Sequence, residues 1–102
     1  MSEEPSSMST GGTVQAVTVR YWAAARAAAG VEQDNLEVDG VTTLDQVLER
    51  VRLRHVDRAR FKDVVTVCSV LIGDRPVGTT DPAAVVVQPG DTVELLPPFA
   101  GG

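Results

Sequence analysis

The chain has 102 residues, of which 43% are hydrophobic and 23% are charged. This length allows one small domain, and the composition is close to that of globular proteins, which excludes collagen-like and wholly disordered chains. A membrane span is not expected, because no stretch approaches about 18 uninterrupted apolar residues. Residues 1–12 are polar and lack the apolar segment of a secretory signal, so we expect a cytoplasmic protein.

The net charge and the small number of cysteine and histidine residues exclude further classes of function. Nine basic and 14 acidic residues give a net charge of −5, which argues against nucleic acid as the main partner, since binding to phosphates needs clustered positive charge. A protein partner with a basic surface suits this balance better. A single cysteine, Cys68, and a single histidine, His55, are too few for a disulfide or for a structural zinc site with its usual set of about four ligands.

The first part of the chain predicts a tail, a strand and a short helix. Residues 1–13 are rich in Ser, Thr, Gly and Glu, and we expect a disordered tail there. Between Val17 and Trp22 apolar and polar side chains alternate, which is typical of a half-buried strand. Residues 23–30 (AAARAAAG) combine strong helix formers with Gly30, which suits the left-handed position after a helix.

A second strand and a longer helix should follow. The strand is expected over Asn35–Val38, before the turn signal of Asp39 and Gly40. Thr43 and Gln46 have the spacing of a capping box, in which each side chain satisfies the backbone N–H of the other residue. The helix should then begin at Leu44. Its apolar residues recur at i, i+3, i+4 and i+7 and predict one stripe facing the core: Leu44, Val47, Leu48 and Val51.

The remaining elements are predicted to be strands. Residues 64–72 (VVTVCSVLI) form a β-branched run that predicts a central strand. Pro76 and Val77 predict a short edge strand, and residues 85–87 a further short strand. The last strand is expected over Thr92–Leu96, because Pro97 has no N–H with which to continue it. This order of elements predicts an α+β fold, with the domain spanning residues 14–96.

No catalytic constellation is evident in the sequence. His55 lies near the end of the predicted helix among arginines, so we interpret it as a surface residue rather than a general base. Cys68 lies in the apolar run, where a free thiol behaves as a small inert hydrophobe. The paired carboxylates Glu3 and Glu4 fall in the tail, and no phosphate-binding glycine motif is present. Trp22 is interpreted as a core residue in preference to a binding anchor, with both interpretations open.

The C-terminal segment LLPPFAGG is the unusual feature of the chain. Pro97 and Pro98 favour an extended conformation, and Gly101 and Gly102 carry no side chains. The six residues 97–102 can reach about 18–20 Å at roughly 3.1–3.3 Å each. The terminal carboxylate is ionised at neutral pH and is a poor electrophile, so it reacts only after activation, for example as an acyl-adenylate. A thin glycine end suits a narrow channel in a second protein, and a frayed terminus without function is the competing interpretation.

These segments resemble the ubiquitin-like β-grasp sulfur carriers, particularly the small subunits of molybdopterin synthase. The resemblance covers about residues 17–102 and is strongest in QPGDTVELLPPFAGG. Members of this family typically end in a Gly-Asp-x-Val strand, two prolines and Gly-Gly. The matching residues here are Gly90, Asp91, Val93, Pro97, Pro98, Gly101 and Gly102. The resemblance implies a mixed sheet packed on one main helix.

The resemblance also implies a mechanism. A ubiquitin-activating-like enzyme would use ATP and magnesium to adenylate Gly102, and a sulfur donor, either a cysteine desulfurase or a rhodanese-like protein, would convert it to a thiocarboxylate. In molybdopterin synthase the tail inserts into the large subunit and donates sulfur to cyclic pyranopterin monophosphate. The catalytic groups belong to the large subunit, so this chain would be a non-catalytic carrier that binds no metal or cofactor itself. Its reactive end would be Gly101 and Gly102, and its partner-binding residues Pro97, Pro98, Phe99 and Ala100.

Several alternatives stay open. Phe99 and Ala100 stand where many molybdopterin synthase subunits have a smaller apolar residue and a small polar one, and the tail over residues 1–13 is atypical. Sulfur carriers for cysteine, thiamine or tRNA thiolation end in a similar way, and a ubiquitin-like modifier would join Gly102 to lysines of other proteins. A binding module with an incidental tail is the remaining alternative. We expect Phe99 to anchor a partner, and the competing interpretation is that it folds back over Leu96.

Overall fold

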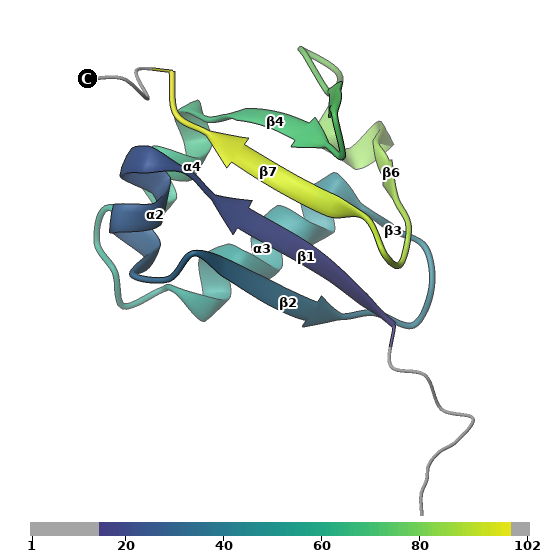
Figure 1. Cartoon of the computed structure of the whole chain (residues 1–102), viewed down its shortest axis with the longest axis horizontal. Helices are drawn as coiled ribbons and strands as arrows, with labels where there is room; N and C mark the ends of the chain where they lie inside the picture. The colour runs from purple at the N-terminus through teal and green to yellow at the C-terminus, as the bar shows by residue number, and fades with distance from the viewer. Residues whose placement is uncertain (1–14, 99–102) are drawn as a thin grey trace, which may run out of the picture.

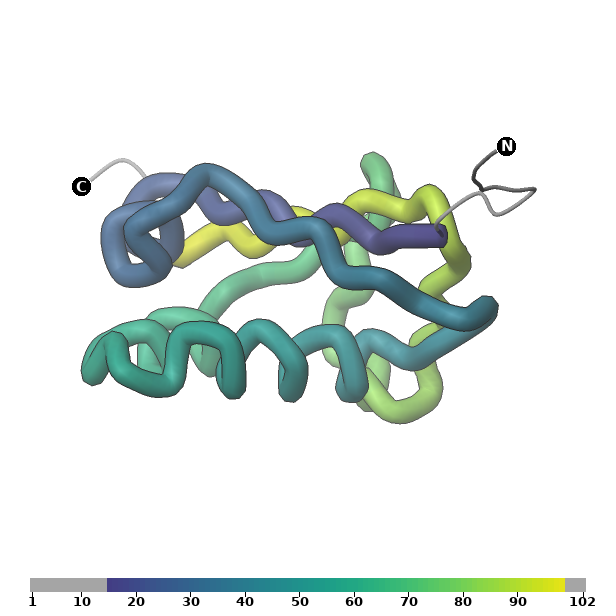
Figure 2. The backbone as a smooth tube through the Cα atoms, turned by 90° about the horizontal axis from the view of Figure 1, so that it is seen from below, coloured from purple at the N-terminus to yellow at the C-terminus, as the bar shows by residue number. Residues whose placement is uncertain are grey.

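The computed structural model describes residues 15–98, in which a sheet and a set of helices form two layers (Figures 1 and 2). The elements are, in chain order, β1 (Ala16–Tyr21), α2 (Ala23–Ala29), β2 (Gln33–Glu37), β3 (Thr42–Thr43), α3 (Leu44–Arg54), α4 (Phe61–Val67), β4 (Ser69–Ile72), β5 (Arg75–Pro76), a 3-10 helix η1 (Pro82–Ala84), β6 (Val86–Val87) and β7 (Thr92–Leu96). The tail expected over residues 1–13 lies outside the described residues.

The main sheet has five strands in the order β2-β1-β7-β4-β5 (Figure 1). β1 and β7 pair in parallel, with Val19 opposite Val93, whereas the other neighbours pair antiparallel. β3 and β6 form a separate two-stranded sheet beside the 3-10 helix. The expected α+β fold with a mixed sheet is therefore confirmed.

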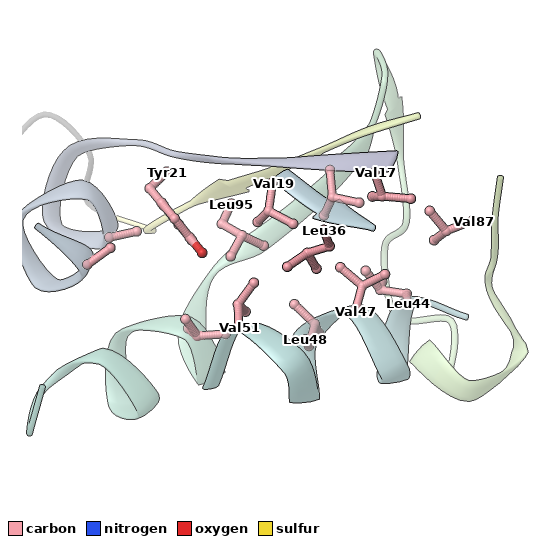
Figure 3. Close-up of a cluster of buried hydrophobic side chains, with 14 of the residues drawn as sticks. Val17, Val19, Tyr21, Leu36, Leu44, Val47, Leu48, Val51, Val87 and Leu95 are labelled. Carbon is pink, nitrogen blue, oxygen red and sulfur yellow. The ribbon is translucent and has the colours of Figure 1, made fainter. Parts of the chain in front are cut away.

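The core lies between the sheet and α3. Val17, Val19 and Tyr21 of β1 point toward α3, together with Leu36 of β2 and Leu95 of β7 (Figure 3). The predicted stripe of α3 meets them, and all four of its members are buried: Leu44, Val47, Leu48 and Val51. Full burial of such a side chain stabilises the fold by about 1.5–3 kcal/mol, so the spacing of this stripe decides which face of α3 packs on the sheet.

The two helix ends predicted from the sequence are formed, with one difference. Gly30 follows α2 with φ of 79°, and its N–H donates to the carbonyl of Arg26. The Thr43 side chain accepts a hydrogen bond from the backbone N–H of Gln46 at 3.2 Å. The Gln46 side chain does not complete the box as predicted, because its Oε1 accepts from the Thr42 hydroxyl at 2.6 Å.

The central strand predicted within residues 64–72 is confirmed, and it occupies only the second half of that run. The segment up to Val67 belongs to α4, and β4 contains Ser69–Ile72 alone, between β7 and the short edge strand β5. Phe61 and Val65 are one helical turn apart and both are buried. Burial of this pair outweighs the β propensity of the valine run, since propensity is weaker than tertiary packing. β2 also begins earlier than predicted, at Gln33.

Candidate functional site

The C-terminal tail leaves the domain from the middle of the main sheet. β7 lies between β1 and β4, and its last residue, Leu96, pairs with Ser69 (Figure 1). Val93 and Leu95 are fully buried and hold this strand against the core. The root of the tail is therefore fixed by neighbours on both sides, which a strand at the edge of the sheet would lack.

Of the predicted partner-binding residues, the structure describes only the two prolines at the root of the tail. Pro97 is buried in the domain, and Pro98 is exposed. Phe99, Ala100, Gly101 and Gly102 lie outside the described residues. Because Pro97 belongs to the domain, the part of the chain that can extend from it is at most residues 98–102, with a reach of about 16 Å at roughly 3.3 Å per residue.

Trp22 lies on the outer face of the sheet, beside the root of the tail. Its backbone N–H donates to the carbonyl of Leu95 at 3.2 Å, and its indole Nε1 donates to Glu94 Oε1 at 3.0 Å. The guanidinium carbon of Arg20 lies 4.9 Å from the centre of the indole ring. Trp22 is 39% exposed, so its interpretation as a core residue is wrong. The indole follows the alternation of β1, which directs even-numbered side chains away from α3.

A buried polar cluster connects the sheet to the end of α3. Asp34 of β2 accepts hydrogen bonds at 2.6 Å from the Tyr21 hydroxyl and from His55 Nε2, and Arg54 lies 3.2 Å from its second oxygen. His55 also packs against Phe61, with the ring centres 4.7 Å apart. His55 is 8% exposed, so the prediction of a surface histidine is wrong. The sequence held a usable signal, because His55 follows Val51 by four residues and extends the buried stripe of α3.

Two members of this cluster, Asp34 and Tyr21, have shifted pKa values. Burial alone raises the pKa of the Asp34 carboxyl, but hydrogen bonds from Tyr21, His55 and Arg54 outweigh it and place the pKa below its usual value. Burial, followed by the contact with Asp34, raises the pKa of the Tyr21 hydroxyl. No nucleophile adjoins the cluster among residues 15–98, so its geometry fits a structural bridge rather than an acid–base centre. Asp34 was not singled out from the sequence.

Cys68 is positioned where its thiol is unreactive. It follows α4 rather than lying in a strand, and its Sγ donates to the carbonyl of Val64 at 3.2 Å. Burial raises the pKa of the Cys68 thiol to about 11. The thiolate is the nucleophilic form, so little of it exists at neutral pH. The described residues contain no group of three side chains suited to a metal, and no helix within them is long and apolar enough to span a membrane.

The comparisons with known proteins agree with this architecture. The ThiS family model matches residues 19–102, which is most of the chain and includes both terminal glycines. The chain belongs to the ThiS family. Membership confirms the resemblance to ubiquitin-like sulfur carriers, and the matched segment of this ThiS-family chain extends through Gly102. No curated protein matches the sequence significantly.

Solved structures of similar fold support the β-grasp assignment for this ThiS-family chain. A protein designated molybdopterin converting factor subunit 1, from Pyrococcus furiosus, is 24% identical, with a TM-score of 0.66 over 82% of this chain and 98% of that one. SAMP1 from Haloferax volcanii is 21% identical, with a TM-score of 0.68 over 85% and 99%. Subunit 1 in a complex of subunits 1 and 2 of molybdopterin-converting factor from Helicobacter pylori is 23% identical, with a TM-score of 0.57 over 85% and 99%.

Proposed function

We propose that this chain is a cytoplasmic sulfur carrier that loads sulfur on Gly102 and delivers it as the small subunit of a molybdopterin synthase. The observation that carries the proposal is the family match, which extends to Gly102, together with the position of β7, whose end lies in the middle of the sheet.

The chemistry follows from the terminal carboxylate. An adenylating enzyme, using ATP and magnesium, would join the carboxylate to AMP and release pyrophosphate, which supplies a leaving group. The persulfide of a desulfurase or rhodanese-like donor would then displace AMP and form an acyl disulfide with Gly102. A thiol reductant would cleave the S–S bond, so that Gly102 ends in a thiocarboxylate and the donor regains its thiol. The large subunit would accept the tail and transfer the sulfur to cyclic pyranopterin monophosphate. The buried root at Pro97 supports this role, because it fixes the base of the tail while the residues that follow would enter a partner.

The test is sulfur loading of the full-length chain. Incubation with the cognate adenylating enzyme, ATP, magnesium and a sulfur source should raise the intact mass by about 16 Da, as one oxygen is replaced by sulfur. Deletion of Gly102 should abolish loading and leave the melting temperature unchanged, since an exposed terminus makes few buried contacts. An unloaded wild-type chain, or a large loss of stability in the deletion variant, would contradict the proposal.

The choice of acceptor needs a second measurement. The loaded chain, mixed with the cognate large subunit and cyclic pyranopterin monophosphate, should yield the dithiolene product. Transfer instead to a cysteine, thiamine or tRNA precursor would assign the carrier to another pathway. A ubiquitin-like modifier is the other candidate. Chain building on itself would have to use the N-terminus or Lys62, which is the sole lysine and is exposed on α4. Covalent conjugates of Gly102 with lysine side chains would identify that role.

A further inference from the structure

Positive charge is concentrated at one corner of this acidic protein. Residues 52–62 span the end of α3, the α3–α4 connection and the start of α4. They contain five cationic side chains and one carboxylate, a local charge of +4 in a chain whose net charge is −5. The cationic residues are Arg52, Arg54, Arg58, Arg60 and Lys62. This corner is therefore positively charged, although the chain as a whole carries a net negative charge.

Two large apolar side chains are exposed at the same place. Leu53 is 62% exposed and Val56 is 77% exposed. Neither contributes to the stripe of α3 that faces the sheet, so the core does not explain them. Single exposed apolar residues are common on protein surfaces. These two, however, line one hollow of about 300 Å³ together with Arg52, Arg58 and Lys62. We call these five residues the basic corner.

The basic corner is formed in the free protein. The Arg58 guanidinium lies against the backbone of Gly30, where an added Cβ would come within 2.5 Å of it. The backbone N–H of Arg58 donates to the carbonyl of His55 at 2.9 Å, and the ring of His55 is fixed beneath the surface by Asp34. A partner would therefore meet an ordered surface, which lowers the entropy lost on binding.

The cations of the basic corner are available to a partner. Arg54, which lies outside the corner as defined, is engaged by Asp34 at 3.2 Å. Arg52 lies 3.6 Å from Glu49, which also lines the hollow; because the Glu49 side chain is exposed, solvent weakens this pair. Within residues 15–98, no ion pair joins Arg58 or Lys62 to a carboxylate. Positive charge next to exposed apolar side chains is complementary to a protein segment that carries carboxylates and apolar residues.

The basic corner lies at the end of the molecule from which the tail departs. Figure 1 shows α2 and α4 at the end of the sheet where β7 ends. α4, about 10 Å long, leads from Lys62 to Ser69, which pairs with Leu96 at the root of the tail. A protein bound at the corner would thus remain close enough to receive the residues that follow Pro97.

We propose that the basic corner docks an acidic, apolar segment of the protein that accepts the tail. This inference rests on the proposed function, because a carrier must orient a tail that is too short to supply orientation by itself. The exposed Leu53 and Val56 favour a protein segment over a nucleic acid, which would be held mainly by its phosphates.

The test uses the full-length chain with its cognate adenylating enzyme and its cognate large subunit, each titrated by calorimetry. The double variant Leu53→Ser/Lys62→Glu should bind the large subunit, which accepts the tail, about tenfold more weakly. Both sites are exposed, so the melting temperature should change little. Wild-type binding should weaken between about 0.05 M and about 0.3 M salt more steeply than binding of the variant. Arg75→Glu, on the exposed edge strand β5, is the control for charge and should bind like wild type.

The outcomes separate this inference from the carrier role. If the wild-type chain is loaded with sulfur and the double variant binds the large subunit as tightly as wild type, the basic corner does not dock that protein, whether or not binding to the adenylating enzyme has weakened. If no loading occurs, the carrier role itself fails. A fluorescent single-stranded oligonucleotide is the competing probe. If the double variant no longer binds the oligonucleotide but binds the protein partner as tightly as wild type, the proposal is overturned in favour of a nucleic-acid site.

Discussion

The imidazole Nε2 of His55 lies 2.6 Å from the carboxylate of Asp34, which joins the end of α3 to strand β2. Both side chains are buried, although 21 positions separate them in the sequence. A buried carboxylate is stable in a protein only when donors surround it. Tyr21 and Arg54 complete the set here, so the cluster fixes the end of α3 against the sheet close to the basic corner.

This cluster predicts a loss of stability in acid. The folded-state pKa of Asp34 lies below its unfolded value, so its contribution is fully present above about pH 4 and is lost as pH falls through the folded pKa. Asp34→Asn should therefore weaken the pH dependence of the free energy of unfolding between about pH 5 and pH 2. Urea unfolding at a series of pH values measures this. Asp74→Asn, in an exposed turn, should behave like wild type, and an equal slope in all three proteins would contradict the role of Asp34.

Truncation of His55 should be far more damaging than truncation of its neighbour. His55→Ala removes a buried ring that packs on Phe61 and takes one donor from Asp34, at a cost of about 2–4 kcal/mol. Arg54→Ala removes a half-exposed partner and should cost less than about 1 kcal/mol. Denaturant unfolding of the two variants checks the difference. Small and equal effects would restore the interpretation of His55 as a surface residue.

The start of α3 should depend on Thr43 more than on Gln46. Thr43→Ala removes the acceptor for the Gln46 backbone N–H and should destabilise the fold by about 1 kcal/mol. Gln46→Ala removes an exposed side chain that binds the Thr42 hydroxyl, so a change within about 0.5 kcal/mol is expected. Thermal unfolding of both variants is the measurement. A loss with Gln46→Ala as large as with Thr43→Ala would mean that the reciprocal half of the capping box forms in solution.

Trp22 should matter more to binding than to folding. Because 39% of the side chain is exposed, Trp22→Ala should cost about 1 kcal/mol, whereas truncation of a core tryptophan costs about 3–5 kcal/mol. The indole lies beside the root of the tail, so affinity for the adenylating enzyme or the large subunit should also fall. Unfolding and calorimetry on the same variant separate the two effects. A loss of several kcal/mol with unchanged binding would show that the indole serves the core.

Phe99 remains the predicted anchor within the tail itself. Phe99→Ala should weaken binding to the adenylating enzyme or to the large subunit at least about tenfold, because aromatic side chains concentrate the binding energy of interfaces. The fold should be unaffected, since Pro97 is the last buried residue among those described. Isothermal calorimetry with both partners tests this. Unchanged affinities would leave the outer face of the sheet, with Trp22, as the recognition surface.

The sequence by itself determined the elements that have a regular period. β1 and α3 were predicted because their apolar residues recur every second position or along one helical stripe, and β7 because strand-forming residues stop at Pro97; these patterns are local. The run over residues 64–72 has no such period. Its division into α4 and β4 depends on the burial of Phe61 and Val65, which the tertiary structure decides.

The site divides in the same way. The Gly-Gly terminus and its two prolines are properties of the sequence alone, and the prediction of an activated C-terminus starts from them. The tertiary structure decided that the tail departs from between β1 and β4, that Pro97 belongs to the domain, and that Trp22 faces outward. It also decided that Asp34 and His55 meet. Each of these features depends on contacts between strands and helices that lie far apart in the sequence, and a local sequence pattern does not predict such contacts.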